Sequence, residues 1–204
     1  MVGDKRRATS PTRADRLRAG VALFNAGHYL PAHEPWERSW LTDSRGRRDD
    51  CLQGLVQTAA AVHHARDGNV EGAVGLAETA IEYLSGCPPT IEAPIEWLEA
   101  LLDGTVSGAP PPIRLGGEAI EPADLTYPTV AIAAEALAEH RGDEFVEDAV
   151  AYATADLAKG DATTPFVTLV RDYLVDGDGI VAQRLTEHVQ RRRARETDVE
   201  GLFE

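Results

Sequence analysis

The chain has 204 residues, of which 43% are hydrophobic, and its formal net charge at pH 7 is −14. This length and apolar content support one globular domain with a buried core, and they exclude an intrinsically disordered chain. No apolar run approaches the roughly 20 residues of a membrane-spanning helix, and the first residues lack the apolar stretch of a signal peptide. We therefore expect a cytoplasmic protein that has no membrane partner.

The acidic charge is accompanied by a near absence of lysine, since Lys5 and Lys159 stand beside eighteen arginines. An acidic surface with little lysine keeps a protein hydrated and dispersed in molar salt, where screening shortens electrostatic repulsion. We therefore expect a halophilic protein. Basic residues gather at 1–18 and 191–195 and could contact phosphates, but high salt weakens such contacts, so nucleic-acid binding is disfavoured.

The two cysteines, Cys51 and Cys87, occur in no CxxC or CxxH pattern. A disulfide framework or a zinc knuckle is therefore not expected, and a reducing cytoplasm is the simpler interpretation. We expect two partly buried thiols that pack as small hydrophobic side chains.

The predicted fold class is all-α, a compact antiparallel bundle-like domain with a helical C-terminal extension. Residues 1–11 are predicted to be a disordered basic tail. Residues 12–104 form a helical core, in which short turns favour antiparallel packing of successive helices. The helices of this core are predicted at 13–25, from 31 to the polar turn at 42–48, and at 50–66, 70–85 and 94–103.

Residues 105–127 contain prolines and glycines without apolar periodicity, which predicts an irregular loop and the most mobile internal segment. Within it, residues 113–115 and 118–120 flank Gly116-Gly117 and predict at most one tiny β-hairpin. Residues 128–204 are expected to be a helical C-terminal half packed on the core. Its helices are predicted at 128–140, 143–159, 165–175 and 179–196.

The second predicted helix carries polar and aromatic residues on one side. At about 100° per residue, His33 and Glu37 share a face, and Glu34 lies at its margin. The same arc of about 100° contains three aromatic residues. These residues, which could form an aromatic surface, are Tyr29, Trp36 and Trp40.

The third predicted helix places three polar residues within an arc of about 40°. If this helix packs antiparallel to the second one, polar side chains of both could face one another. The candidate polar site then comprises His33, Glu34, Glu37, Gln53, Gln57 and His64.

Three interpretations of this site stay open. It could be a buried hydrogen-bond network that fixes the packing, because buried polar groups must be paired. It could be the site of a metal-assisted, hydrolase-like enzyme, with His33, Glu37 and His64 binding a divalent metal ion. It could also be a groove for a small ligand or a partner protein, with the aromatic residues supplying apolar contact.

Residues 24–84 contain an ordered set of motifs. They include Phe24-Asn25, Gly27-His28-Tyr29, Ala32-His33-Glu34-Pro35-Trp36-Glu37, Leu52-Gln53-Gly54-Leu55-Val56-Gln57 and Gly68-Asn69. The set resembles the family named domain of unknown function three hundred and nine. This resemblance implies a compact helical fold built around a three-helix unit, and it implies no activity.

The chain departs from that family in two places. Members of the family commonly have an aliphatic residue after His-Glu, whereas this chain has Pro35, which would loosen the first turn of its helix. Residues 145–204 lie outside the motif set and are similar to an extension of halophilic relatives.

Overall fold

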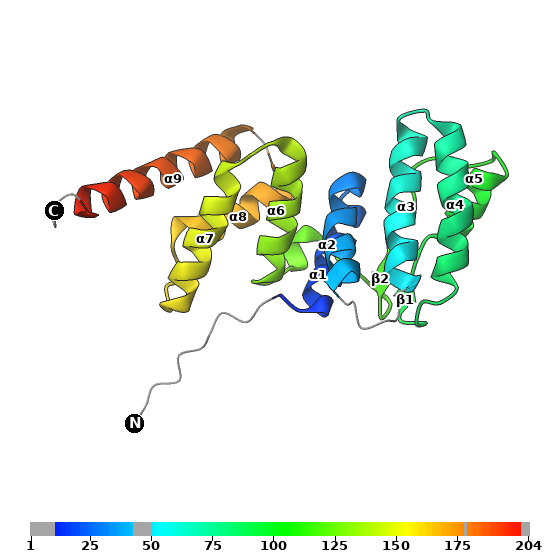
Figure 1. The fold of residues 1–204 in the computed structure, drawn as a ribbon, viewed down its shortest axis with the longest axis horizontal. Coiled ribbons are helices and arrows are strands. Elements are labelled where there is room, and N and C mark those ends of the chain that lie inside the picture. The colour runs from blue at the N-terminus through cyan, green and yellow to red at the C-terminus, as the bar shows by residue number, and fades with distance from the viewer. Residues whose placement is uncertain (1–10, 43–49, 178, 201–204) are drawn as a thin grey trace, which may run out of the picture.

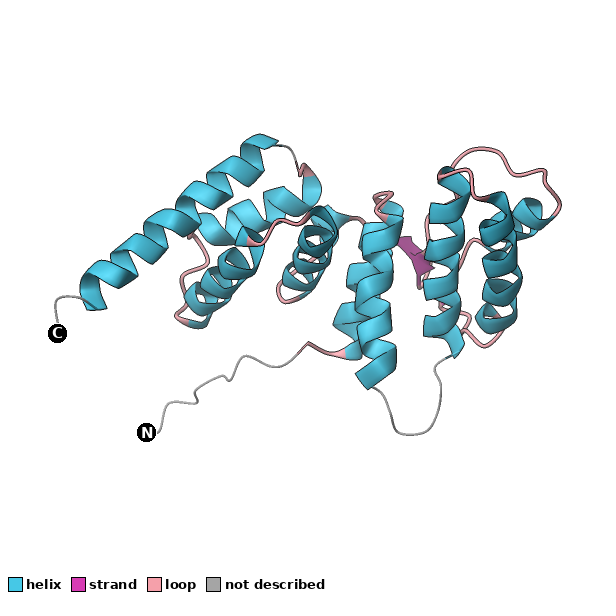
Figure 2. Cartoon of the chain, turned by 45° about the horizontal axis from the view of Figure 1, so that its top comes forward, coloured by secondary structure: helices cyan, strands magenta, loops and turns pink. Residues whose placement is uncertain are grey.

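The computed structural model describes residues 11–42, 50–177 and 179–200. Within these residues the protein is predominantly α-helical, and the strands form one short antiparallel sheet (Figures 1 and 2). The expected all-α fold class is therefore confirmed. The predicted disordered tail lies outside the described residues, apart from its last residue, Pro11.

The elements follow one another with short connections, apart from the segment that carries β2, β3 and η1. The helices are α1 (Arg13–Asn25), α2 (Tyr29–Thr42), α3 (Asp50–Arg66), α4 (Val70–Leu84), α5 (Ile95–Leu102), α6 (Thr129–Arg141), α7 (Phe145–Ala158), α8 (Pro165–Val175) and α9 (Gly179–Glu200). The remaining elements are β1 (Ile91–Glu92), β2 (Arg114–Leu115), β3 (Glu118–Ala119) and the 3-10 turn η1 (Pro122–Asp124). In Figure 1, α1 and α2 occupy the middle of an elongated molecule, between α3–α5 and α6–α9.

Local sequence explains where α1 begins and ends. Thr12 and Asp15 form a capping box, in which the backbone N–H of Asp15 donates to Thr12 Oγ1 and that of Thr12 donates to the Asp15 carboxylate. At the other end Gly27 has a φ of 82°, and the N–H of His28 donates to the carbonyl of Leu23 at 2.9 Å. This arrangement is a Schellman motif, and it turns the chain directly into α2.

The helix α2 begins at Tyr29, two residues before the predicted start, so that Pro35 lies in its interior. The proline lacks an N–H, yet the helix continues to Thr42. On its buried side α2 packs closely on α1 at Gly20, where an added Cβ would lie 2.3 Å from the indole Nε1 of Trp36. That indole donates to the carbonyl of Leu17 at 3.2 Å, which fixes the two helices against each other.

The helices α3 and α4 form an antiparallel hairpin. Asn69 caps the start of α4 by accepting a hydrogen bond from the N–H of Gly72 at 3.0 Å. Near the other end of α4, a Cβ added to Gly54 would lie 2.9 Å from the backbone nitrogen of Leu84. A side chain at residue 54 would therefore force the two helices apart.

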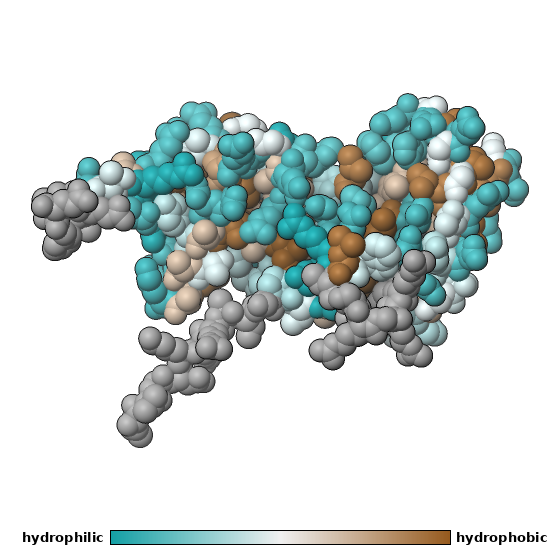
Figure 3. All heavy atoms as spheres, viewed as in Figure 1, coloured by the Kyte–Doolittle hydropathy of each residue, from teal (hydrophilic) through white to brown (hydrophobic). Residues whose placement is uncertain are grey.

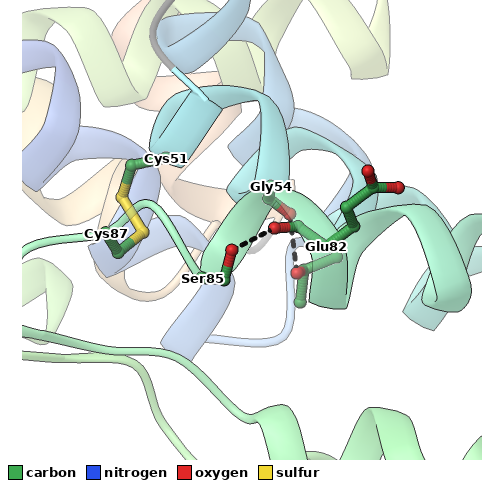
Figure 4. The surroundings of a disulfide bond; sticks show 6 residues. Cys51, Gly54, Glu82, Ser85 and Cys87 are labelled. Carbon is green, nitrogen blue, oxygen red and sulfur yellow. Dashed lines mark hydrogen bonds between the residues drawn. A yellow bond between two sulfur atoms is a disulfide. The ribbon is translucent and has the colours of Figure 1, made fainter.

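A disulfide joins Cys51 to Cys87 at the open end of this hairpin (Figure 4). The prediction of two free thiols is therefore wrong. The two residues are 36 positions apart in sequence, but their Cα atoms are only 4.6 Å apart. Cys51 lies in the first turn of α3 and Cys87 follows the end of α4, so the antiparallel packing itself brings the two sulfur atoms together.

The hairpin predicted around Gly116-Gly117 is present as β2 and β3, and β1 adds a third strand that was not predicted. Both glycines have positive φ angles, 63° and 85°, as a two-residue turn requires. The side chain of Asn25 at the end of α1 holds this hairpin. Its Nδ2 donates to the carbonyls of Ile113 and Ile120 at 3.0 Å, and its Oδ1 accepts from the N–H of Ile113 at 2.8 Å. The high mobility predicted for this part of the chain stays a prediction, and these bonds oppose it.

The C-terminal helices extend the molecule from α6, which packs against both α1 and α2. Next, α8 packs on α6 and α7, and α9 packs on α7 and α8. Leu185 and Val189 are buried apolar residues of α9. Arg192 adds a charged contact, since its Nη1 lies 3.2 Å from both carboxylate oxygens of Asp156 and its guanidinium lies over the ring of Tyr152.

The other arginines of the predicted basic C-terminal segment also make contacts within the protein. Arg193 pairs with Asp148 of α7, and Arg191 pairs with Glu187 one turn earlier on α9. Figure 3 shows mostly hydrophilic residues on the displayed face, with hydrophobic ones in scattered groups. None of the helices in the described part of the chain combines the length and apolar character needed to cross a bilayer.

Candidate functional site

One edge of α2 carries three side chains of the types that bind metal ions. His33 Nε2 lies 3.3 Å from Glu37 Oε2, one helical turn further on. Glu34 lies beside both, and one ligand atom from each of the three residues falls within 4.8 Å of the others. We call His33, Glu34 and Glu37 the α2 cluster. The structure thus brings together three of the six residues predicted for the polar site.

The side chains of the α2 cluster are partly exposed, by 30% for His33, 42% for Glu37 and 24% for Glu34. Each of the three side chains is therefore partly covered by neighbouring groups and partly open to solvent. An imidazole nitrogen and two carboxylate oxygens are suitable ligands for Zn²⁺ and other divalent transition metals. An ion held by three protein ligands keeps a coordination position for water or a small ligand.

Arg38, one turn after Glu34, connects the α2 cluster to α6. Its Nη2 lies 3.4 Å from Glu34 Oε1 and 2.7 Å from Glu139 Oε2. The shorter distance marks the contact with Glu139 as the better hydrogen bond. Sequence reasoning missed both residues. The four-residue spacing of Glu34 and Arg38 could have predicted their ion pair on one helix. The contact with Glu139 could not have been predicted in this way, because Glu139 is 101 positions from Arg38.

Arg66 at the end of α3 reaches α2, where its guanidinium lies 5.3 Å from the ring centroid of Tyr29. At about 100° per residue, Gln57 lies roughly 180° around α3 from Arg66. Gln53 and His64 lie at roughly 140° and 160° from it, so on a helical projection all three lie on the side of α3 opposite Arg66.

The predicted convergence of the two helices' polar residues is therefore wrong for His64, and it stays a prediction for Gln53 and Gln57. His64 Nδ1 lies 3.0 Å from Asn69 Nδ2, at the start of α4, and His64 is not part of the α2 cluster. Within the described ranges, Gln57 Oε1 is buried and has no hydrogen-bond partner. Gln53 is half-buried. The third possible metal ligand beside His33 and Glu37 is Glu34, in place of the predicted His64.

The predicted aromatic surface is corrected as well. Trp36 is fully buried, and Tyr29 is 8% exposed and packs edge-on against Phe24, with 4.9 Å between the ring centroids. Trp40 is partly buried against the same core. Two of these three aromatic side chains are core residues, because α2 is covered by α1 on one side and by α3 on another.

A cavity of about 830 Å³ is lined by Arg38 of α2 and by residues of α6, α7 and α9 and of the turn between α6 and α7. Burial raises the pKa of Glu135 on its wall, nearby Glu147 raises it further, and Arg38 lowers it. Arg38 and Arg193 also line the cavity, together with six carboxylate residues. These are Glu135, Glu139, Asp143, Glu144, Glu147 and Asp148. Sequence reasoning missed this cavity because it is formed by turns and helices that meet only in the fold.

Comparisons with known proteins match the first part of the chain. Residues 17–76 match the family described as "Domain of unknown function (DUF309)", a segment that runs from α1 into α4 and includes the α2 cluster. A stretch of 106 residues is 24% identical to an "Uncharacterized protein" of Aquifex aeolicus (strain VF5). That alignment covers 50% of this chain and 32% of the relative, so the chain spans about a third of the length of the curated relative it matches. The resemblance indicated by the motifs of residues 24–84 is thus confirmed, as a match to DUF309 over residues 17–76.

Proposed function

We propose that this protein binds a divalent transition-metal ion through the α2 cluster and presents the open side of that ion to a small ligand. The observation that carries the proposal is the approach of three donor atoms, one nitrogen and two oxygens, to within 4.8 Å of one another. The two carboxylates also supply the negative charge that balances a divalent cation.

The spacing of the donors supports this proposal. Two ligand atoms that each lie about 2.1 Å from a tetrahedral ion are roughly 3.4 Å apart. His33 Nε2 and Glu37 Oε2 are already 3.3 Å apart, so these two donors would need little movement to share an ion. Partial burial holds the side chains in place, and their solvent-facing side leaves room for water or a ligand on the metal.

The metal-assisted hydrolase is a narrower form of the same proposal. A hydrolase would need a metal-bound water and a general base in addition to the ion. Metal binding is the step that both functions require, and it can be tested without knowing a substrate.

The other predicted functions have lost part of their support. A partner surface built on aromatic residues is weakened, because Trp36 is fully buried. Nucleic-acid contact through the C-terminal arginines is weakened because Arg192 and Arg193 pair with Asp156 and Asp148.

The cytoplasmic location and the adaptation to salt stay proposals. The acidic, lysine-poor composition supports adaptation to salt. The Cys51–Cys87 disulfide speaks against a strongly reducing compartment, because disulfides persist mainly in oxidising ones. Alkylation of free thiols in intact cells, followed by mass spectrometry, would show whether this bond is formed in the cell.

Metal titration of the purified, metal-free protein tests the proposed function. We expect one Co²⁺ per chain with a visible absorption band, and competition by Zn²⁺. Replacing a ligand, in His33→Ala or Glu37→Gln, should weaken binding by more than the roughly 10–100-fold that outer-shell changes cost. Circular dichroism of each variant would verify that α2 still folds.

The chain offers a matched control on α3. His63 Nε2 and Asp67 Oδ2 also lie 3.3 Å apart at a spacing of four residues, but the structure groups no third donor with them among the residues that it describes. His63→Ala should therefore leave the affinity unchanged. Unchanged binding in His33→Ala, or loss of binding in His63→Ala, would contradict the proposed function.

A further inference from the structure

The guanidinium of Arg38 stands where it must compete with a metal ion for Glu34. The same Nη2 atom lies 3.4 Å from Glu34 Oε1 and 2.7 Å from Glu139 Oε2. A metal ion on the α2 cluster needs the Glu34 carboxylate, and it also brings two positive charges close to the guanidinium. Both effects disfavour the contact between Arg38 and Glu34 once metal binds.

Glu139 provides the alternative partner that this exchange requires. It is 58% exposed and belongs to α6, so it is not one of the metal ligands, and its contact with Arg38 is already the shorter one. Both Glu139 and Arg38 line the acidic cavity described above. The arginine can therefore give up Glu34 and keep a charged hydrogen bond.

We propose that Arg38 sets the affinity of the α2 metal site, because it contacts both Glu34 and Glu139 while the site is empty and must give up Glu34, keeping Glu139, when metal binds. This inference rests on the proposed function, since it concerns the same site.

A double-mutant cycle tests this role of Arg38, with Co²⁺ titration of the full chain as the measurement. Arg38→Gln removes the competitor and should lower the Kd for Co²⁺ about threefold. Glu139→Gln removes the carboxylate that competes with Glu34 for Arg38 and should raise the Kd about threefold. In the double variant, the Glu139→Gln change should have no effect, because Arg38 is no longer there to transmit it.

The cycle distinguishes an effect of Glu139 that acts through Arg38 from a direct electrostatic effect of the Glu139 charge on the metal. If Glu139 acted only as a negative charge near the site, its removal would raise the Kd by the same factor with or without Arg38. Glu144→Gln, which removes a charge from the wall of the same cavity, is the control and should change the Kd equally in both backgrounds.

The outcomes also separate this inference from the proposed function. Additive effects in the cycle, or an unchanged Kd in Arg38→Gln, would overturn the inference, and loss of binding in His33→Ala would still support the proposed function. Binding that survives in His33→Ala, or no binding by the wild type, would overturn both. Support requires loss of binding in His33→Ala together with a Glu139→Gln effect that vanishes without Arg38.

Discussion

The two ends of the molecule are held together by different kinds of contact. At the end formed by α3, α4 and α5, the helices pack through small apolar residues and close approaches such as Gly54 against Leu84, and the Cys51–Cys87 disulfide ties them. At the end formed by α6 to α9, charged groups cross between helices. Arg192 of α9 pairs with Asp156 of α7, and the Tyr173 hydroxyl donates to Asp143 at 2.6 Å.

The two ends should therefore respond to different conditions. Reductant should weaken the α3–α4 end, whereas the loss of single charges should weaken the α7–α9 end. The α2 cluster lies between them, and the Arg38–Glu139 pair joins α2 to α6. A functional site at this boundary can be influenced from both ends.

The largest effect is expected from removal of the disulfide. Reduction, or the Cys51→Ala and Cys87→Ala double variant, frees a loop of 36 residues and should lower the free energy of unfolding by about 3–4 kcal/mol. Urea unfolding measures this loss of free energy. Hydrogen exchange should show that the backbone amides of α3 and α4 lose the most protection. An equal loss of amide protection in α7 and α9 would contradict the claim that the disulfide stabilises only the α3–α4 end.

The next effect concerns the charged contact of α9. The Asp156 side chain is only 7% exposed, so Arg192→Met leaves a nearly buried carboxylate unpaired and should cost about 2–3 kcal/mol. The control is Arg191→Met, because the Arg191–Glu187 pair is exposed by 60% and 49% and should contribute less than about 0.5 kcal/mol. Equal destabilisation in both variants would show that pairing with Asp156 is not what holds α9.

Salt should stabilise the acidic region formed by residues 67–160. Residues 67–160 contain eighteen acidic residues and only Arg114, Arg141 and Lys159 as basic ones, so their mutual repulsion weakens as salt screens it. Raising KCl from low to molar concentration should add about 1–2 kcal/mol, or about 2–8 °C in Tm. A Tm that does not change with salt would remove the case for a halophilic protein.

The smallest predicted effect is a pH dependence at the turn between α1 and α2. Burial, with added repulsion from Arg141 and His140, lowers the pKa of His28 below its ordinary value of 6.5. The folded protein then binds fewer protons than the unfolded chain, so stability present above pH 6.5 is lost as the pH falls through the folded pKa. The Tm of His28→Asn should fall less between pH 7 and pH 5 than that of the wild type. An unchanged or steeper fall would show that His28 does not cause the acid sensitivity.

The local features of the fold could be predicted from the sequence. Gly27 marks the end of α1, the Gly116-Gly117 pair marks the hairpin, and the spacing of His33 and Glu37 marks the shared edge of α2. Each of these signals depends on a few neighbouring residues and on backbone geometry, which the sequence states directly.

The features that the sequence did not reveal depend on how whole elements meet. A helical projection shows that Gln53, Gln57 and His64 share a side of α3, but it does not show which side meets α2. Packing of α3 on α4 brings Cys51 to Cys87, and packing of α6 on α2 brings Glu139 to Arg38. No local pattern encodes these long-range meetings.

The most direct test of the central claim is to locate a bound metal ion in crystals of the protein grown with Zn²⁺. An anomalous difference map collected at the zinc edge would show the position of the ion. We predict a peak at the exposed edge of α2, about 2.0–2.2 Å from a ring nitrogen of His33 and from a carboxylate oxygen of Glu37. A map with no peak at the α2 cluster, or with its strongest peak at the His63–Asp67 pair, would contradict the proposal that α2 carries a metal site.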